Sequence, residues 1–393
     1  MRYKFNEIAI NSVEKRIPTE DDKANYIGLE HLESGSLSVS TWGSAVSLKG
    51  EKIVMRKGDV LFGKRNTYLR RASIAPHDGL FSAHGMVLRP KPEVIDPSFF
   101  PFFVNSDEFF NSTIRISVGS LSPTVNWKDM KELEFDLPPI EKQRELAELL
   151  WAANDLKESY KKLITASDEM LKAKFREMFG ECGVQSAECG VKLGDCLSDI
   201  RYGVSLPPEF VENAPVKFIR ATNVNRGIID EEKMLTITEE TASKIEKCRL
   251  NGRELIIVRS GANAGDSCFV PEQYRGSCAG YDIIIRVDEE KILPEWLGYL
   301  LVVPEYFRSQ IKPLTNRTAQ PHINAEQVKS LPVAFRNYAL RTHHSALPPL
   351  ATQQEFVEIA RKADETKAAL KKSIADVETV IKGLINGGRV FNI

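Results

Sequence analysis

The segment LPPIEKQREL at residues 137–146 returns with changed letters as LPPLATQQEF at residues 347–356. Proline fits the first turn of a helix, because the N–H that it lacks would have no partner there. Each segment therefore predicts the start of a helix. Two such starts in one chain restrict the fold to one that contains two related halves.

Further matches occur in the same order along the chain. YIGLEHLESG at 26–35 matches FIRATNVNRG at 218–227, and KGDVLFGK at 57–64 matches GRELIIVR at 252–259. Ahead of the two LPP motifs, four residues of one copy correspond to four of the other: Pro123, Asn126, Met130 and Leu133 to Pro321, Asn324, Val328 and Leu331. The offsets of 192, 195 and 198 residues are nearly constant. They predict a duplicated unit of roughly two hundred residues.

The LPP motifs themselves are 210 residues apart, because the second copy inserts FRNYALRTHHSA at 335–346. We interpret this insert as a surface loop or hairpin, where extra residues are well tolerated. Adjacent histidines in an extended segment point apart, which disfavours a metal site at His343 and His344. A contact of the insert with a nucleic-acid backbone is an alternative.

Each copy starts with short apolar runs bounded by Gly and Asp, such as EKIVMRKGDVLFGK, which predict strands. Each copy ends in a long helix after its LPP motif. We therefore predict the α/β (α+β) class, with globular domains at 1–136 and 181–346 and helices at 137–180 and 347–393.

The two helices carry apolar or small residues in a three-four alternation, which predicts a coiled coil. In the first helix these residues are Leu146, Leu149, Ala153, Leu156, Tyr160, Leu163, Ser167 and Met170. In the second they are Phe356, Ile359, Ala363, Thr366, Leu370, Ser373, Val377, Val380 and Leu384. Each helix could instead pack on its own domain. The narrow stripe and the length of roughly 35 residues favour pairing of the two helices.

Composition excludes several classes of protein. Hydrophobic residues make up 42% of the chain and charged residues 27%, with no run of the ~20 apolar residues that a membrane span needs. The start of the chain lacks a signal peptide, so we expect a cytoplasmic protein. Six cysteines lack the spacing of metal sites and are expected to be free thiols: Cys182, Cys189, Cys196, Cys248, Cys268 and Cys278.

Catalytic motifs are missing from the sequence. There is no phosphate-binding G-x4-GK[ST] loop, no G-x-S-x-G elbow and no H-E-x-x-H helix. The DEEK stretches at 230–233 and 288–291 are interpreted as solvated charges. We therefore expect no catalytic residue, no metal ligand and no cofactor in this chain.

Basic residues cluster locally although the net charge is −1. Residues 52–71 hold seven basic side chains against the single acid Asp59, and residues 308–322 hold no acid at all. The repeat places Lys64 opposite Arg259 and Arg115 opposite Lys312. Arg and Lys at matched loop positions suit phosphate neutralisation and recognition of guanine edges.

The order of domain, LPPxxxQ helix, domain and LPPxxxQ helix resembles the specificity subunit of type I restriction-modification systems over essentially the whole chain. LPPIEKQRELAELL, LPPLATQQEFVEIA, GDVLF, RSGANAG and NRTAQPHIN carry this resemblance. It implies two target recognition domains that each bind one half of a split double-stranded DNA sequence. It also implies antiparallel helices that set the spacing and dock two methyltransferase subunits. The resemblance implies that S-adenosylmethionine binds to those methyltransferase subunits and that ATP is used by further restriction or motor subunits.

The DNA contacts that we predict combine matched position with charge. In the first domain they are Lys64, Arg65, Arg70, Arg71 and Arg115. In the second they are Arg201, Arg220, Arg259, Lys312, Arg317 and His322. Arg201 is included because IRYGVSLPP at 200–208 is similar to an early loop of the family.

Two other functions stay open at this point. A coiled-coil adaptor would bind DNA without sequence preference. A nuclease or methyltransferase fused to recognition domains would bind S-adenosylmethionine as an isolated chain.

Overall fold

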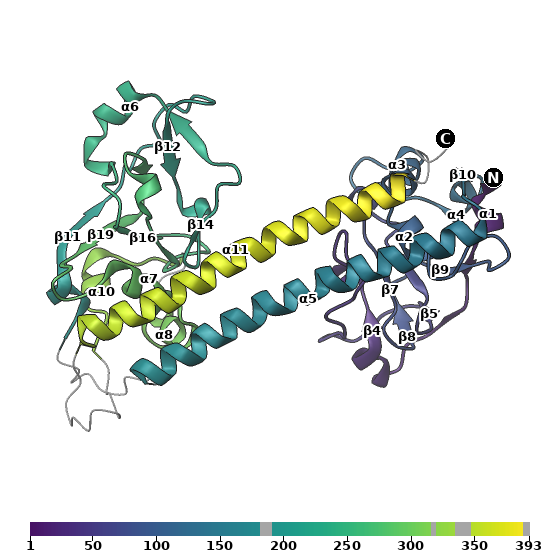
Figure 1. Cartoon of the computed structure of the whole chain (residues 1–393), viewed down its shortest axis with the longest axis horizontal. Helices are drawn as coiled ribbons and strands as arrows, with labels where there is room; N and C mark the ends of the chain where they lie inside the picture. The colour runs from purple at the N-terminus through teal and green to yellow at the C-terminus, as the bar shows by residue number, and fades with distance from the viewer. Residues whose placement is uncertain (181–190, 316–319, 335–346, 388–393) are drawn as a thin grey trace. The chain divides into compact units, whose positions relative to one another are not determined.

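The computed structural model describes residues 1–180, 191–315, 320–334 and 347–387, and Figure 1 shows its helices and strands. The chain divides into two compact units. The first unit comprises Met1–Lys162 with the chain from Leu370 onward, and the second comprises Leu163–Ala369. Both units mix strands with helices, which confirms the predicted fold class. No helix in the described part of the chain has the length and apolar character of a membrane span.

The first unit contains two four-stranded sheets, ordered β2-β9-β6-β7 and β3-β5-β8-β4, and the small pair β1-β10. Its strands are β1 Arg2–Lys4, β2 Ala9–Ser12, β3 Lys15–Arg16, β4 Tyr26–Ile27, β5 Lys52–Met55, β6 Val60–Phe62, β7 Ala72–Ile74, β8 Gly79–Phe81, β9 Met86–Pro90 and β10 Glu134–Asp136. Its short helices are α1 Phe5–Ile8, α2 Phe100–Val104, α3 Asp107–Arg115 and α4 Trp127–Met130.

The second unit contains sheets ordered β11-β19-β16-β17 and β15-β12-β18 and the pair β13-β14. Its strands are β11 Leu197–Tyr202, β12 Val216–Ile219, β13 Val224–Asn225, β14 Ile228–Ile229, β15 Leu235–Ile237, β16 Leu255–Ile257, β17 Ser267–Phe269, β18 Cys278–Ala279 and β19 Ile283–Val287. Its short helices are α6 Glu239–Lys244, α7 Pro294–Val302, α8 Pro304–Tyr306, α9 Lys312–Thr315 and α10 Ala325–Lys329.

Strand registers show the same sheet in both units. Leu61 of β6 pairs with Val87 of β9, and Ile256 of β16 pairs with Ile284 of β19. The offsets are therefore 195 residues (256 − 61) and 197 residues (284 − 87). The sequence repeat matched β6 with β16 at an offset of 195, and we call these two the central strands of their sheets. The duplication therefore extends to the sheet register.

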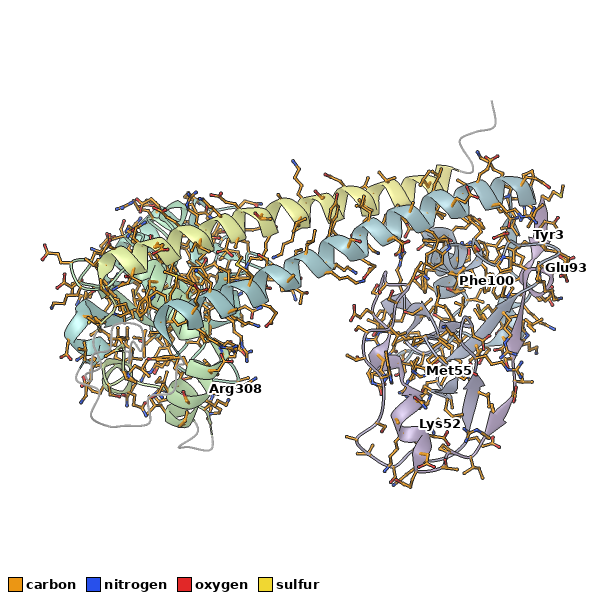
Figure 2. All side chains as sticks on the ribbon, turned by 60° about the horizontal axis from the view of Figure 1, so that its bottom comes forward. Tyr3, Lys52, Met55, Glu93, Phe100 and Arg308 are labelled. Atoms are coloured by element: carbon orange, nitrogen blue, oxygen red, sulfur yellow. The ribbon has the colours of Figure 1, made fainter. Side chains whose placement is uncertain are left out.

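The core of each unit lies on both sides of this sheet. In the first unit Phe100 belongs to the core nearer α5 (Ile140–Phe179), whereas Met55 belongs to a separate core, and both are labelled in Figure 2. In the second unit Trp296 of α7 is fully buried in the core beside α5. Cys196, Cys248, Cys268 and Cys278 are buried free thiols, whereas Cys182 and Cys189 lie outside the described residues.

The first LPP motif is bonded to its unit through a buried glutamine. Gln143 donates its Nε2 protons to the carbonyl oxygens of Pro138 at 2.9 Å and Val94 at 3.2 Å. Its Oε1 accepts the N–H of Asp96 at 2.8 Å. The amide therefore joins the start of α5 to the loop after β9.

The second LPP motif repeats this arrangement at the start of α11 (Leu350–Gly387). Gln353 donates to the carbonyl oxygens of Pro348 at 2.8 Å and Lys291 at 3.3 Å, and it accepts the N–H of Leu293 at 2.8 Å. The insert at 335–346 lies outside the described residues. The helix that follows it nevertheless starts with the same bonds as the first helix.

The long helices pair in antiparallel order within each unit. In the first unit Lys157 of α5 lies 4.0 Å from Glu378 near the end of α11. In the second unit Phe175, near the end of α5, contacts Phe356 of α11 with ring centroids 5.2 Å apart. Contacts that lie later along α5 therefore involve residues that lie earlier along α11.

The seam between the helices differs from the predicted stripe at every second position of α5, and at Thr366 and Val380 of α11. Leu146 is buried, but Leu149, Leu156, Leu163 and Val380 are exposed. The helix face that packs inward instead includes Leu150, Asn154, Lys157, Leu171 and Phe175 on α5, and Phe356, Ala360 and Ala363 on α11. Polar residues occupy part of this seam, which is why apolar periodicity alone selected the neighbouring positions.

Candidate nucleic-acid interface

The loops after the two central strands are built alike. Lys64 follows β6 and its carbonyl oxygen accepts the N–H of Val125 at 3.0 Å. Arg259 follows β16 and its carbonyl oxygen accepts the N–H of Ile323 at 2.9 Å. In each unit one basic residue is thus held where the loop meets the segment before a short helix, α4 or α10.

The first unit presents Lys64 and Arg65 at this position. Burial, with a smaller contribution from the charge of Lys15, lowers the pKa of Lys64. Arg65 is exposed and its Nη2 donates to the Ser122 hydroxyl at 3.2 Å, while its backbone bridges Thr124. Both side chains therefore lie beside the loop that precedes α4.

Arg70 has partners within the unit. Its Nη1 forms an ion pair with Asp107 and its Nη2 donates to Asn111 Oδ1 at 2.7 Å. A contact with DNA would have to share or replace these bonds. Arg71 donates to the carbonyl oxygen of Leu29 at 3.1 Å, whereas Arg115 is exposed at the end of α3.

The second unit holds Arg259 between two tyrosine rings. Its guanidinium carbon lies 4.5 Å from the centroid of Tyr202 and 4.3 Å from that of Tyr281. The Arg259 N–H donates to Asp282 Oδ1 at 3.1 Å. Tyr202 and Tyr281 are 40% and 45% exposed, so the rings flank the arginine at the surface.

Two further predicted contacts lie on neighbouring segments. His322 Nδ1 is 2.8 Å from the hydroxyl of Ser260, and these residues also form a backbone bridge. Lys312 is exposed at the start of α9. Arg317 lies outside the described residues.

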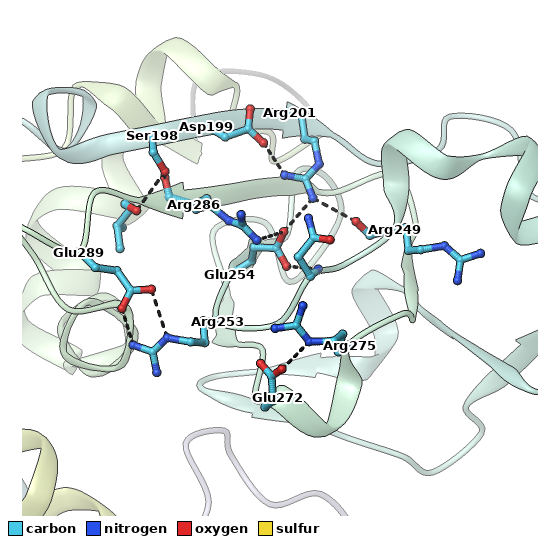
Figure 3. Close-up of polar contacts among 12 residues, drawn as sticks. Ser198, Asp199, Arg201, Arg249, Arg253, Glu254, Glu272, Arg275, Arg286 and Glu289 are labelled. Carbon is cyan, nitrogen blue, oxygen red and sulfur yellow. Dashed lines mark hydrogen bonds and ion pairs between the residues drawn. The ribbon is translucent and has the colours of Figure 1, made fainter.

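Arg201 is bonded within the second unit, as Figure 3 shows. Its guanidinium pairs with Asp199 and, at 2.9 Å, with the buried Glu254, and it donates to the carbonyl oxygens of Lys247 and Arg249 at 3.1 Å each. Burial opposes the charge, but the hydrogen bonds to the two carboxylates outweigh it and raise the pKa of Arg201. These contacts assign the side chain a role in holding β11 against the loop before β16.

The same kind of ion pair occurs in both units. Arg89 of β9 forms two hydrogen bonds with Asp59, at 2.7 and 2.8 Å, and Arg286 of β19 lies 3.5 Å from Glu254. Both acids are buried and stand one residue before the central strand. The pairs therefore fix the start of each of these strands, at the opposite end of the strand from Lys64 and Arg259.

Arg220 is half-buried beside β12. Its Nη2 donates to the carbonyl oxygen of Lys233 at 3.1 Å, and its backbone N–H donates to Asn223 Oδ1 at 3.2 Å. The side chain therefore also bonds within its own unit.

Asp282 is the most strongly perturbed acid of this interface. It is 3% exposed, and burial raises its pKa to about 6, against a smaller opposing effect of the Arg259 N–H. In the unfolded chain the pKa is about 4. The folded protein therefore binds the proton more tightly, and stability falls as the pH rises from about 4 to about 6.

We expect Asp282→Asn to stabilise the protein above pH 6, by on the order of 2 kcal/mol, because Asn carries no charge to bury. Urea unfolding at pH 7.5 and pH 5 measures this gain, which should shrink at the lower pH. The exposed Asp376→Asn on α11 is the control. An equal gain for Asp282→Asn at both pH values would contradict the titration of this carboxyl.

Sequence reasoning missed Tyr202, Tyr281 and Asp282. The available signal was a tyrosine next to a turn glycine, Gly203 or Gly280, in each segment. No group of three or more potential metal ligands occurs among the residues that the structure describes.

Comparison with known proteins gives a consistent result. A family model described as "Type I restriction modification DNA specificity domain" matches residues 3–165 and again residues 198–379. The MjaVIII specificity subunit of a type I restriction enzyme from Methanocaldococcus jannaschii is 23% identical over 371 residues, which cover 90% of this chain and 84% of the relative. The EcoDI specificity subunit from Escherichia coli is 23% identical over 145 residues, 36% of this chain and 32% of the relative.

Solved structures share the fold. The S subunit of a type I restriction-modification system from M. genitalium superimposes with a TM-score of 0.57 at 12% identity, covering 99% of this chain and 95% of that chain. A chain from a study of complex assembly in the type I R-M system gives a TM-score of 0.53 at 17% identity, covering 99% and 97%.

Proposed function

Because this chain belongs to the type I restriction modification DNA specificity family, we propose that its two units each recognise one half of a split double-stranded DNA target. The chain is the specificity subunit of a type I restriction-modification system. Since its proposed target is cellular DNA, we place it in the cytoplasm. We further propose that it carries no catalytic site of its own.

The observation that carries this proposal is the duplicated loop with different side chains. Lys64 and Arg259 occupy equivalent positions after equivalent strands, with equivalent backbone bonds. A common frame with different side chains suits two DNA half-sites of different sequence, because base edges are distinguished by the donors and acceptors that meet them.

The long helices are proposed to set the unrecognised gap between the half-sites. α5 has 40 residues, which corresponds to about 60 Å at 1.5 Å per residue. One turn of B-DNA is about 34 Å, so a spacer of this length suits half-sites more than a turn apart.

Adenine methylation and DNA cleavage are proposed to reside in partner subunits. We propose two methyltransferase subunits that bind S-adenosylmethionine and further restriction subunits that use ATP. This chain would supply target recognition to both.

Co-expression with the methyltransferase subunit tests the proposed function. We expect a stable complex and adenine methylation at one split sequence with a fixed gap, measured by genome-wide mapping of methylated adenine. A complex that methylates no defined sequence, or the absence of any complex and any methylation, would overturn the proposal.

An exposed apolar stripe on α5 is the proposed docking surface for a methyltransferase subunit. Leu149 and Leu156 are 56% and 43% exposed in the first unit, and their spacing of seven residues places them on one helix face. A solvent-exposed leucine repeat on a helix is typical of a surface that another helix covers.

The double change Leu149→Lys and Leu156→Lys is expected to weaken the complex with the methyltransferase subunit at least about tenfold, because charge replaces apolar contact area. Titration by isothermal calorimetry measures the effect. The control pair, Glu148→Lys and Asp155→Lys, places two lysines one position away on the same exposed part of the helix. Equal weakening by both pairs would argue against docking on the leucine face.

A further inference from the structure

Arg259 is held more rigidly than a surface arginine usually is. Both of its backbone polar groups form hydrogen bonds. The Arg259 N–H donates to Asp282 Oδ1, and the Arg259 carbonyl oxygen accepts the N–H of Ile323. Its guanidinium is stacked between two rings, and the hydroxyl of Tyr202 accepts the N–H of Ala325 at 3.0 Å, which fixes that ring. An arginine pre-organised in this way loses little side-chain entropy when it binds a ligand.

The charge of Arg259 also stands apart from the ion-pair network of its unit. Each arginine drawn in Figure 3 is paired with a carboxylate: Arg201, Arg249, Arg253, Arg275 and Arg286. Among the described residues no carboxylate forms an ion pair with Arg259; it contacts aromatic faces instead. A planar guanidinium on aromatic rings keeps its terminal N–H donors available at the ring edges.

Those donors suit one ligand geometry in particular. Two parallel N–H groups match the O6 and N7 acceptors of guanine in the major groove. A phosphate oxygen pair can also accept two bonds, but it carries no base information. The side chain at this position differs between the two units, Lys64 in the first and Arg259 in the second, which favours base recognition over backbone contact.

The first unit lacks this arrangement. Its equivalent of Arg259 is Lys64, and two residues before β9 stands His84 where Tyr281 stands two residues before β19. A lysine ammonium is a point charge without the bidentate geometry of arginine. The two units therefore differ at this position in the kind of base contact that they can make.

We propose that Arg259, held between Tyr202 and Tyr281, recognises a guanine in the half-site bound by the second unit, and that it is a specificity-determining residue. This inference rests on the proposed function. It assigns a role to one residue and one base in one half of the target, which the proposed function leaves open.

The test uses the complex with the methyltransferase subunit and duplexes that contain its mapped target. Each guanine of the target is replaced in turn by 7-deazaguanine, which removes the N7 acceptor and leaves base pairing intact. We expect one guanine at which this change weakens binding of the wild-type complex about tenfold. The Arg259→Ala complex should bind the unmodified target at least about tenfold more weakly and be indifferent to the change at that same guanine.

Further variants separate this role from a structural one. Arg259→Lys keeps the charge but not the two parallel donors and should reduce the sensitivity at that guanine, whereas Arg275→Ala, which removes a paired arginine of the same unit, should keep it in full. Lys64→Ala should affect only the other half-site. If Arg259→Ala lowers the unfolding midpoint, its weaker binding could come from misfolding. The sensitivity to 7-deazaguanine is then measured with the Arg259→Lys complex instead.

Two results would overturn the inference while the proposed function stands. One is a wild-type complex that recognises a split target, while the Arg259→Lys and Arg259→Ala complexes show the full wild-type sensitivity to 7-deazaguanine at every guanine of that target. The other is a uniform loss of affinity with a salt slope reduced by about one, which indicates a phosphate contact. The absence of any methylated split target would instead remove the proposed function itself.

Discussion

Replacing Glu254 with alanine is expected to lower the free energy of unfolding of the second unit by about 3 kcal/mol. The Glu254 carboxylate is fully buried and meets Arg201 at 2.9 Å, Arg286 at 3.5 Å and the N–H of Asn251 at 2.7 Å. Without it, two guanidinium groups lose a counter-charge and one N–H loses its acceptor. Urea unfolding followed by circular dichroism measures the change.

The location of this effect can be checked by hydrogen exchange. Amides of β16 and β19 should exchange faster in the Glu254→Ala variant, whereas those of the first unit should not. Glu272→Ala removes an exposed acid paired with Arg275 and should leave the unfolding midpoint unchanged. If both variants unfold at the wild-type urea concentration, the buried network does not stabilise this unit.

Replacing Gln353 with alanine is expected to destabilise the second unit by a similar amount, about 3 kcal/mol. Gln353 is fully buried, and its loss leaves the Leu293 N–H and the carbonyl oxygens of Pro348 and Lys291 without their side-chain partner. Each unpaired buried group costs roughly 1–3 kcal/mol, partly recovered by water. Denaturant unfolding with hydrogen exchange of the α11 start measures the loss.

The neighbouring Gln354 is exposed and provides a matched control, since Gln354→Ala removes the same amide from the same helix turn. Gln143→Ala should produce the equivalent loss in the first unit only. A Gln353→Ala variant as stable as Gln354→Ala would show that the bonds contribute nothing to the start of the helix.

The sequence repeat predicted the fold accurately where local pattern decides structure. The matched segments KGDVLFGK and GRELIIVR became β6 and β16, and the LPP motifs became the starts of α5 and α11. Strand alternation, turn glycines and proline in a first turn are properties of short segments, so they can be recognised in the sequence without knowledge of the tertiary contacts. The role of Gln143 could not be predicted in this way, because its hydrogen-bond partners Val94 and Asp96 lie 49 and 47 residues away in the sequence.

The coiled-coil seam was only half predicted for a related reason. Leu156 belongs to the apolar repeat yet is exposed, whereas Lys157 is buried and donates to the carbonyl oxygen of Gly35 at 3.3 Å. Periodicity identifies an apolar face but does not say which molecule covers it. A buried lysine with a distant carbonyl partner leaves no trace in the apolar pattern.

The sequence alone determined that this chain is a duplicated α/β protein with two long helices and basic loops at equivalent positions, because repeats and periodicity are local. Only the tertiary structure decided which basic side chains are bonded within their unit. Arg70 pairs with Asp107 and Arg201 with Glu254, 37 and 53 residues away, whereas Arg259 meets two tyrosines. The sequence shows which residues are charged. Whether a charged side chain can contact DNA depends on the groups that folding brings beside it.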